Sequence, residues 1–113
     1  MPKDTELLDS AKAIFEQQTE GDKRQGIELN DLLQKYIWIG MDEEDAVGTL
    51  KKYFNHVHID RHEKQISYYA MHQYDIGYFL LVIKSKLVFV YITCNDGKVT
   101  GCHLHVRETH GMD

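Results

Sequence analysis

The spacing of the apolar residues changes once along this chain, after Phe54, and that change limits what the chain can fold into. In the segment 4–20, apolar residues recur at helical spacing, which places them on one side of a helix. In the segment 56–60, apolar and polar residues alternate, which is the period of a strand with one buried face. Helices followed by strands, in 113 residues of which 42% are hydrophobic, predict one α+β domain.

Three helices are predicted in the first half of the chain. Segments 4–20 and 30–37 carry apolar stripes, and a polar loop bounded by glycines joins them at 21–26. Asp42 is a favourable N-cap for the third helix, 42–54, because its side chain can accept hydrogen bonds from unpaired backbone N–H groups. Acidic residues follow it in the first turn, where the helix dipole favours them.

Strands are predicted in the second half, and the dipeptide Asp96-Gly97 is the strongest hairpin signal. The expected strands are 56–60, 65–73, 78–83, 87–94 and 99–106, with connections at 74–77 and 84–86. The expected fold class is α+β, with two or three N-terminal helices packed on one face of a four- or five-stranded antiparallel meander. We expect a single domain over 1–113, with a helical part (1–55), an antiparallel sheet (56–106) and a frayed tail (107–113).

The register of the last hairpin decides which face of the sheet the helices cover. A two-residue loop pairs Cys94 with Val99 and Cys102 with Tyr91, which puts the two sulfurs on opposite faces, where they cannot bond. We expect the helices to cover the face of Leu87, Phe89, Tyr91, Cys102, Leu104 and Val106. The other face, with Val88, Val90, Ile92, Cys94, Val99, His103 and His105, is then open unless the sheet curls around it.

Charge and cysteine content favour a cytoplasmic protein that binds a basic partner. The net charge is −5; the first 48 residues carry −7 and the remainder +2. Such an acidic half repels nucleic acid and steers a basic partner, although it also serves solubility alone. With no secretory signal, no long apolar run for a membrane span and two cysteines, we expect reduced thiols in a cytoplasm.

Histidine is the strongest indication of a metal site or an enzyme. His56 and His58 share a strand face, and so do His103 and His105, so two pairs could form a four-histidine zinc site. In a simple meander, however, the first and last strands lie at opposite edges, and an exposed polar edge strand explains His56 and His58 equally well. A metal-independent RNase would need two imidazoles converging on a phosphate pocket, and the spacing does not require this. We therefore predict no enzyme activity and no cofactor.

Two short motifs resemble those of a known group of domains. Gly40-Met41-Asp42-Glu43-Glu44, followed by Ala46, Val47 and Leu50, resembles the helix start of small bacterial helix–helix–sheet domains. The segment Ile92-Thr93-Cys94-Asn95-Asp96-Gly97-Lys98-Val99 is similar to their final hairpin. These domains are related to the outer-membrane assembly lipoprotein BamE and to the beta-lactamase inhibitor protein, and the resemblance covers about residues 40–106. It implies a non-catalytic, protein-binding scaffold of the kind used by cytosolic toxin-immunity proteins.

The resulting hypothesis is an immunity or antitoxin protein that occludes the active site of a cognate toxin. A basic nuclease domain is one partner that fits the acidic charge; nucleic acid and membrane are not expected partners, and the free protein is a monomer or homodimer. Two alternatives are a small ligand- or metal-binding domain that uses the histidine-rich sheet face, and a non-catalytic homodimeric regulatory module. The predicted partner-binding residues are Asp42, Glu43, Glu44 and Asp45 on the helix and Val88, Val90, Ile92, His103 and His105 on the sheet.

Overall fold

The computed structural model describes residues 5–17, 26–79 and 82–112. The loop expected at 21–26 falls outside these ranges except for Gly26. The elements are α1 (Glu6–Glu16), β1 (Ile27–Glu28), α2 (Asn30–Leu33), α3 (Glu43–Tyr53), β2 (Val57–His62), β3 (Gln65–Phe79), β4 (Val82–Asn95) and β5 (Lys98–Met112).

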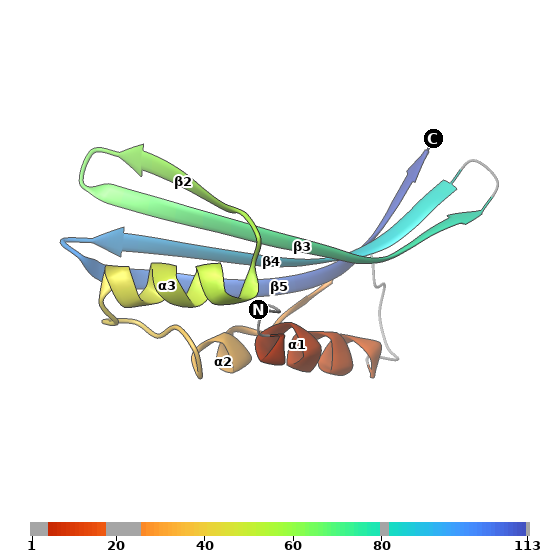
Figure 1. Cartoon of the computed structure of the whole chain (residues 1–113), viewed down its shortest axis with the longest axis horizontal. Helices are drawn as coiled ribbons and strands as arrows, with labels where there is room; N and C mark the ends of the chain where they lie inside the picture. The colour runs from red at the N-terminus through yellow and green to blue at the C-terminus, as the bar shows by residue number, and fades with distance from the viewer. Residues whose placement is uncertain (1–4, 18–25, 80–81, 113) are drawn as a thin grey trace.

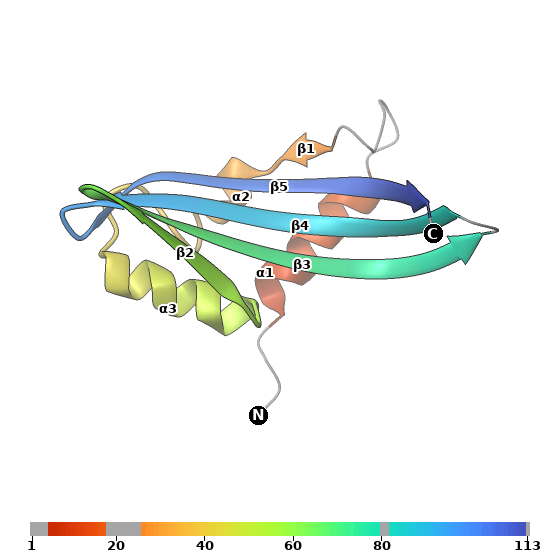
Figure 2. The ribbon, with the colours of Figure 1, turned by 90° about the horizontal axis from the view of Figure 1, so that it is seen from above.

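The molecule has two layers, which confirms the predicted α+β class (Figure 1). The strands form one antiparallel sheet in the order β1-β5-β4-β3-β2, so the short β1 is the fifth strand, at the outer edge of β5. All three helices lie against the same face of this sheet (Figures 1 and 2). Within the described ranges, no helix covers the other face, which we call the open face.

Apolar stripes hold α1 and α3 on the sheet, as the spacing predicted. Helix α3 begins directly after Asp42, but the Asp42 side chain caps no backbone group and instead pairs with the ammonium of Lys98. The backbone N–H of Glu43 donates to the carbonyl of Gly97 at 2.8 Å, so the start of α3 is fixed to the β4–β5 turn. The residues that these two helices bury are Leu7, Leu8, Ala11 and Phe15 of α1 and Ala46, Leu50 and Tyr53 of α3.

Strands β3 and β4 are longer than the sequence indicated, because both continue through segments that we expected to be connections. Positions 74–77 form a bulge rather than a turn: the pairing with β4 shifts there, and Asp75 has a φ of 51°. Positions 84–86 lie inside β4. Strand β5 also continues to Met112, which pairs with Val82, so residues 107–112 of the segment expected to be a frayed tail are part of the sheet. Figure 2 shows the far ends of β3, β4 and β5 extending past α1.

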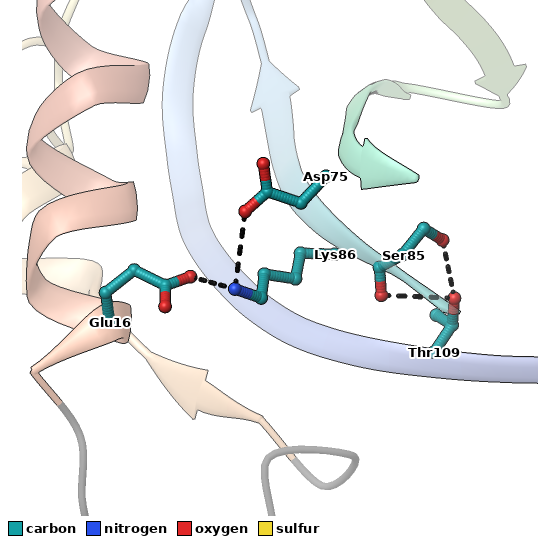
Figure 3. A network of polar contacts seen from close by, with 5 residues as sticks. All are labelled: Glu16, Asp75, Ser85, Lys86 and Thr109. Atoms are coloured by element: carbon teal, nitrogen blue, oxygen red, sulfur yellow. Dashed lines mark hydrogen bonds and ion pairs between the residues drawn. The ribbon is translucent and has the colours of Figure 1, made fainter. Parts of the chain in front are cut away.

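A polar network fixes the bulge of β3 to the end of α1 (Figure 3). The ammonium of Lys86 in β4 contacts the carboxylate of Glu16 and lies 3.4 Å from that of Asp75. Burial opposes the charge of Lys86, but the two carboxylates raise its pKa on balance. Beside it, the Ser85 and Thr109 hydroxyl oxygens are 2.8 Å apart and join β4 to β5.

The turn between β4 and β5 is the predicted two-residue hairpin. Asn95 pairs with Lys98, and Cys94 pairs with Val99, as expected. Asp96 and Gly97 have φ values of 53° and 77°, as a type I′ turn requires.

The strand register shifts after the Cys94–Val99 pair, and this shift contradicts the expected assignment of the β4 residues to the two faces of the sheet. Pairing resumes at Thr93 with Gly101, so Thr100 is an extra residue on β5. Cys102 therefore lies opposite Ile92 rather than opposite Tyr91. A Cβ on Gly101 would lie only 2.8 Å from the Thr93 hydroxyl oxygen, so the bulge brings these strands close enough to favour glycine.

Side chains alternate along a strand, so every second residue of β4 lies in the core, together with Cys102, Leu104 and Val106 of β5. These β4 residues are Val88, Val90, Ile92 and Cys94. Both cysteines consequently lie on the covered face, as free and buried thiols, and the prediction of opposite faces was wrong. Burial raises the pKa of Cys94 to about 11 and also raises that of Cys102. The core cluster includes Tyr68, Ala70, Val88, Val90, Ile92, Cys94 and Val99 from the sheet, packed on the helix residues named above.

Across the described ranges, no helix has the length and apolar character needed to cross a membrane.

Candidate interaction surface

A row of aromatic rings crosses the open face, with one ring on each of four adjacent strands. His58 of β2 pairs with Tyr69 of β3, Tyr69 with Tyr91 of β4, and Tyr91 with His103 of β5. The ring centroids of neighbours are 6.0, 4.8 and 6.2 Å apart, in that order. We call these four residues the aromatic row. Tyr69 is 41% exposed, so a large ring that could fill a core lies at the surface instead.

A pocket of about 420 Å³ adjoins the aromatic row where β2 joins the sheet. It lies over β3 and is bounded by the first residues of β2 on one side and by β4 on the other. Its lining contains no Asp, Glu, Lys or Arg, and its volume falls within the usual range of small-molecule sites. The lining residues are His56, His58, Tyr69, Ala70, Met71, Phe89, Val90 and Tyr91.

Charged groups occur on the β5 side of the open face. The guanidinium carbon of Arg107 lies 5.4 Å from the ring centre of Phe89, a cation–π arrangement. Nδ1 of His105 lies 3.1 Å from a carboxylate oxygen of Glu28, which joins β1 to β5. The open face therefore has an uncharged centre with a polar border, which is the common pattern of protein interfaces.

The predicted sheet residues of the site fall on two different faces. Val88, Val90 and Ile92 were expected on an open surface, but they are at most 1% exposed and lie beneath the helices, because the extra residue Thr100 reverses the orientation of β4 relative to β5. Phe89 and Tyr91, expected in the core, line the pocket on the open face instead, whereas Leu87 is buried, as expected. His103 and His105 do lie on the open face, as expected.

The predicted acidic residues lie in the helical layer, at the N-terminal end of α3. Asp42 already contacts Lys98, and Glu43 accepts a hydrogen bond of 2.5 Å from the hydroxyl of Tyr68. Burial and this contact raise the pKa of Tyr68 to about 12. Glu44 and Asp45 are exposed. The structure therefore does not bring the acidic group and the open face together in one contiguous surface.

The two histidine pairs are also kept apart. His56 directly precedes β2 and His58 lies within it, His103 and His105 are on β5, and strands β3 and β4 lie between the two pairs. As expected, β2 lies at one edge and is separated from β5, but β5 is not at the opposite edge, because β1 occupies that position. In the parts of the chain that the structure describes, no group of three or more His, Cys, Asp or Glu side chains is placed to hold a metal ion.

The predicted site did not include Tyr69, Met71, Phe89 or Tyr91. The cluster of tyrosines in the sheet half was one available signal, because tyrosine is common at interfaces. The second was Gly101, since an isolated glycine in a strand often marks a bulge, and a bulge here exchanges the faces.

No family model, curated protein or solved structure matches this chain.

Proposed function

We propose that this chain is a non-catalytic, cytoplasmic protein that neutralises a cognate bacterial toxin by binding to it and covering its active site. The aromatic row on the open face carries the proposal. Tyrosine and histidine rings offer a large, rigid contact area and lose little conformational entropy when a partner covers them. The open face, rather than the acidic end of α3, is the proposed contact surface.

The acidic group has a different part in this proposal. Asp42 and Glu43 are engaged within the protein, which leaves Glu44 and Asp45 to act on a partner. These two residues lie in the helical layer, away from the open face, so they act through the electrostatic field of their carboxylates and speed the approach of a basic partner. Affinity then depends on the aromatic row, and the salt dependence of association depends on α3.

The test begins with recovery of a partner from the native host by affinity purification of the tagged chain, followed by mass spectrometry. Cells that express the recovered toxin domain should survive when this chain is co-expressed. The double variant Tyr69→Ala/Tyr91→Ala should abolish protection, because it removes the two central rings of the row. Trp38→Ala is the matched control, since Trp38 is also an exposed aromatic residue but lies between α2 and α3. Equal loss of protection in both variants would contradict the proposal.

A small-ligand-binding domain is the second candidate, and the 420 Å³ pocket favours it. Native mass spectrometry and metal analysis of the purified protein test it directly. A bound molecule that is lost in Tyr69→Ala/Tyr91→Ala would replace the toxin proposal with this one.

A further inference from the structure

Strand β2 covers only the first part of the outer edge of β3. Strand β2 pairs with β3 only from Gln65 to Ala70, whereas β3 continues to Phe79. From Met71 onward, no strand in the described ranges pairs with this side of β3 (Figure 2). The bulge that begins after Tyr74 interrupts the regular pairing. The regular part of the uncovered edge is therefore the segment 71–74, which we call the free segment.

The two exposed edges on this side of the sheet differ in charge. The outer edge of β2 carries Asp60 and Arg61, and charged side chains on an edge discourage pairing with another strand. The free segment contains no Asp, Glu, Lys or Arg, and Met71, its first residue, is 52% exposed. The free segment therefore has no charged side chain of its own; the nearest charge from the helical layer is the ammonium of Lys12, 4.7 Å from the centre of the Tyr74 ring.

The pocket on the open face lies at the beginning of the free segment. Met71 belongs to both, and the pocket is closed on the other side by His56 and His58, where β2 begins. A strand added beside Met71 would run in line with β2, and every second side chain of that strand would point to the open face. One such side chain would enter the pocket. Because the lining has no carboxylate, a lysine or arginine side chain would lose hydration there without an ionic partner, whereas an aromatic ring would pack on Tyr69 and Phe89.

We propose that the partner docks by adding an extended segment to β3 at residues 71–74 and by placing an uncharged aromatic side chain in the pocket. This inference rests on the proposed function and specifies the chemistry of the partner's contact. Backbone hydrogen bonds to β3 supply affinity, and the aromatic side chain supplies selectivity.

The test uses the full chain and a displayed library of random linear peptides. Selected peptides should share an aromatic residue within an extended, largely uncharged segment. Peptide binding should slow hydrogen exchange at outward-pointing amides of residues 71–74. Met71→Asp should weaken peptide binding by about tenfold or more, because it places a carboxylate between the edge and the pocket. Ile59→Asp is the matched control, since Ile59 is 40% exposed on β2 and lies away from the pocket; its effect should be within about twofold.

Several results would overturn this inference. One is a library that yields no binding peptide, and another is a set of peptides whose affinity Ile59→Asp reduces as much as Met71→Asp does. A dimer in light scattering that Met71→Asp dissociates would show that a second copy occupies the edge. A small molecule that occupies the pocket of the purified protein and blocks the peptides would assign the pocket to a free ligand. None of these measurements uses the toxin, so failure of the neutralisation assay and failure of the docking mode remain separate results.

Discussion

Ile92 tests the assignment of faces because the bulge at Thr100 places this residue in the core. It is fully buried, between Tyr68 on one neighbouring strand and Cys102 on the other. The substitution Ile92→Ala removes the Cγ1, Cγ2 and Cδ1 carbons, each of which contributes about 0.8 kcal/mol by burial. The cavity left behind adds to this loss, so we expect the free energy of unfolding to fall by about 3–4 kcal/mol.

Urea denaturation followed by circular dichroism measures this change as a shift in midpoint at constant slope. Ile59→Ala makes the same chemical deletion at a residue that is 40% exposed, and it should cost less than about 1.5 kcal/mol. Tyr91→Ala should cost about 1 kcal/mol, because it loses a partly exposed contact with Tyr69 on the open face.

The reverse order of effects would refute the reasoning. If Tyr91→Ala is more destabilising than Ile92→Ala, then the odd positions of β4 form the core and β5 has no extra residue at Thr100. If Ile92→Ala and Ile59→Ala cost the same, Ile92 is not buried beneath the helices.

Three further measurements follow from single contacts. Gly26→Ala should lower the free energy of unfolding by at least about 2 kcal/mol, because Gly26 has a φ of 78° and an added Cβ would lie 2.5 Å from the His105 ring. A loss below about 0.5 kcal/mol in urea denaturation would contradict this prediction. Thiol reagents at pH 8 should label the native protein slowly and the unfolded protein fast, because burial raises the pKa of Cys94 to about 11 and also raises that of Cys102. Rapid labelling of the native protein would show that the two thiols are accessible. The neutral Tyr68 hydroxyl should stabilise the protein fully below pH 10 and lose this contribution as the pH rises to about 12, because its pKa is raised in the folded state. Tyr68→Phe should therefore cost about 1 kcal/mol at pH 7 and reduce the alkaline loss of stability in pH-dependent unfolding; an unchanged alkaline profile would argue against the contact.

Features that depend on neighbouring residues could be predicted from the sequence. The turn at Asp96 and Gly97 follows from backbone preferences of those two residues, and the start of α3 after Asp42 follows from the acidic first turn. The layer arrangement follows from the change in apolar spacing after Phe54.

Features that depend on pairing between distant residues could not be predicted in the same way. Asp75 and Gly77 have turn chemistry, but hydrogen bonding to β4 on both sides of the bulge keeps β3 extended. Thr100 itself has no property that marks it as the extra residue, although Gly101 beside it is a signal for a bulge, and a shift of one residue exchanges the inward and outward positions of β4 relative to those of β5. This single shift explains why the predicted site contained Val88 and why Tyr91 was expected in the core.

The alternation along β4 separates residues that hold the fold from residues that belong to the proposed contact surface. Val88, Val90 and Ile92 hold the helices in place, while the intervening Phe89 and Tyr91 point to the open face. If the proposed function holds, substitutions at Phe89 and Tyr91 would alter the contact surface at little cost in stability. Related chains could therefore diverge quickly in specificity while they keep the same buried residues, and a comparison of natural variants should find substitutions concentrated at every second position of this strand.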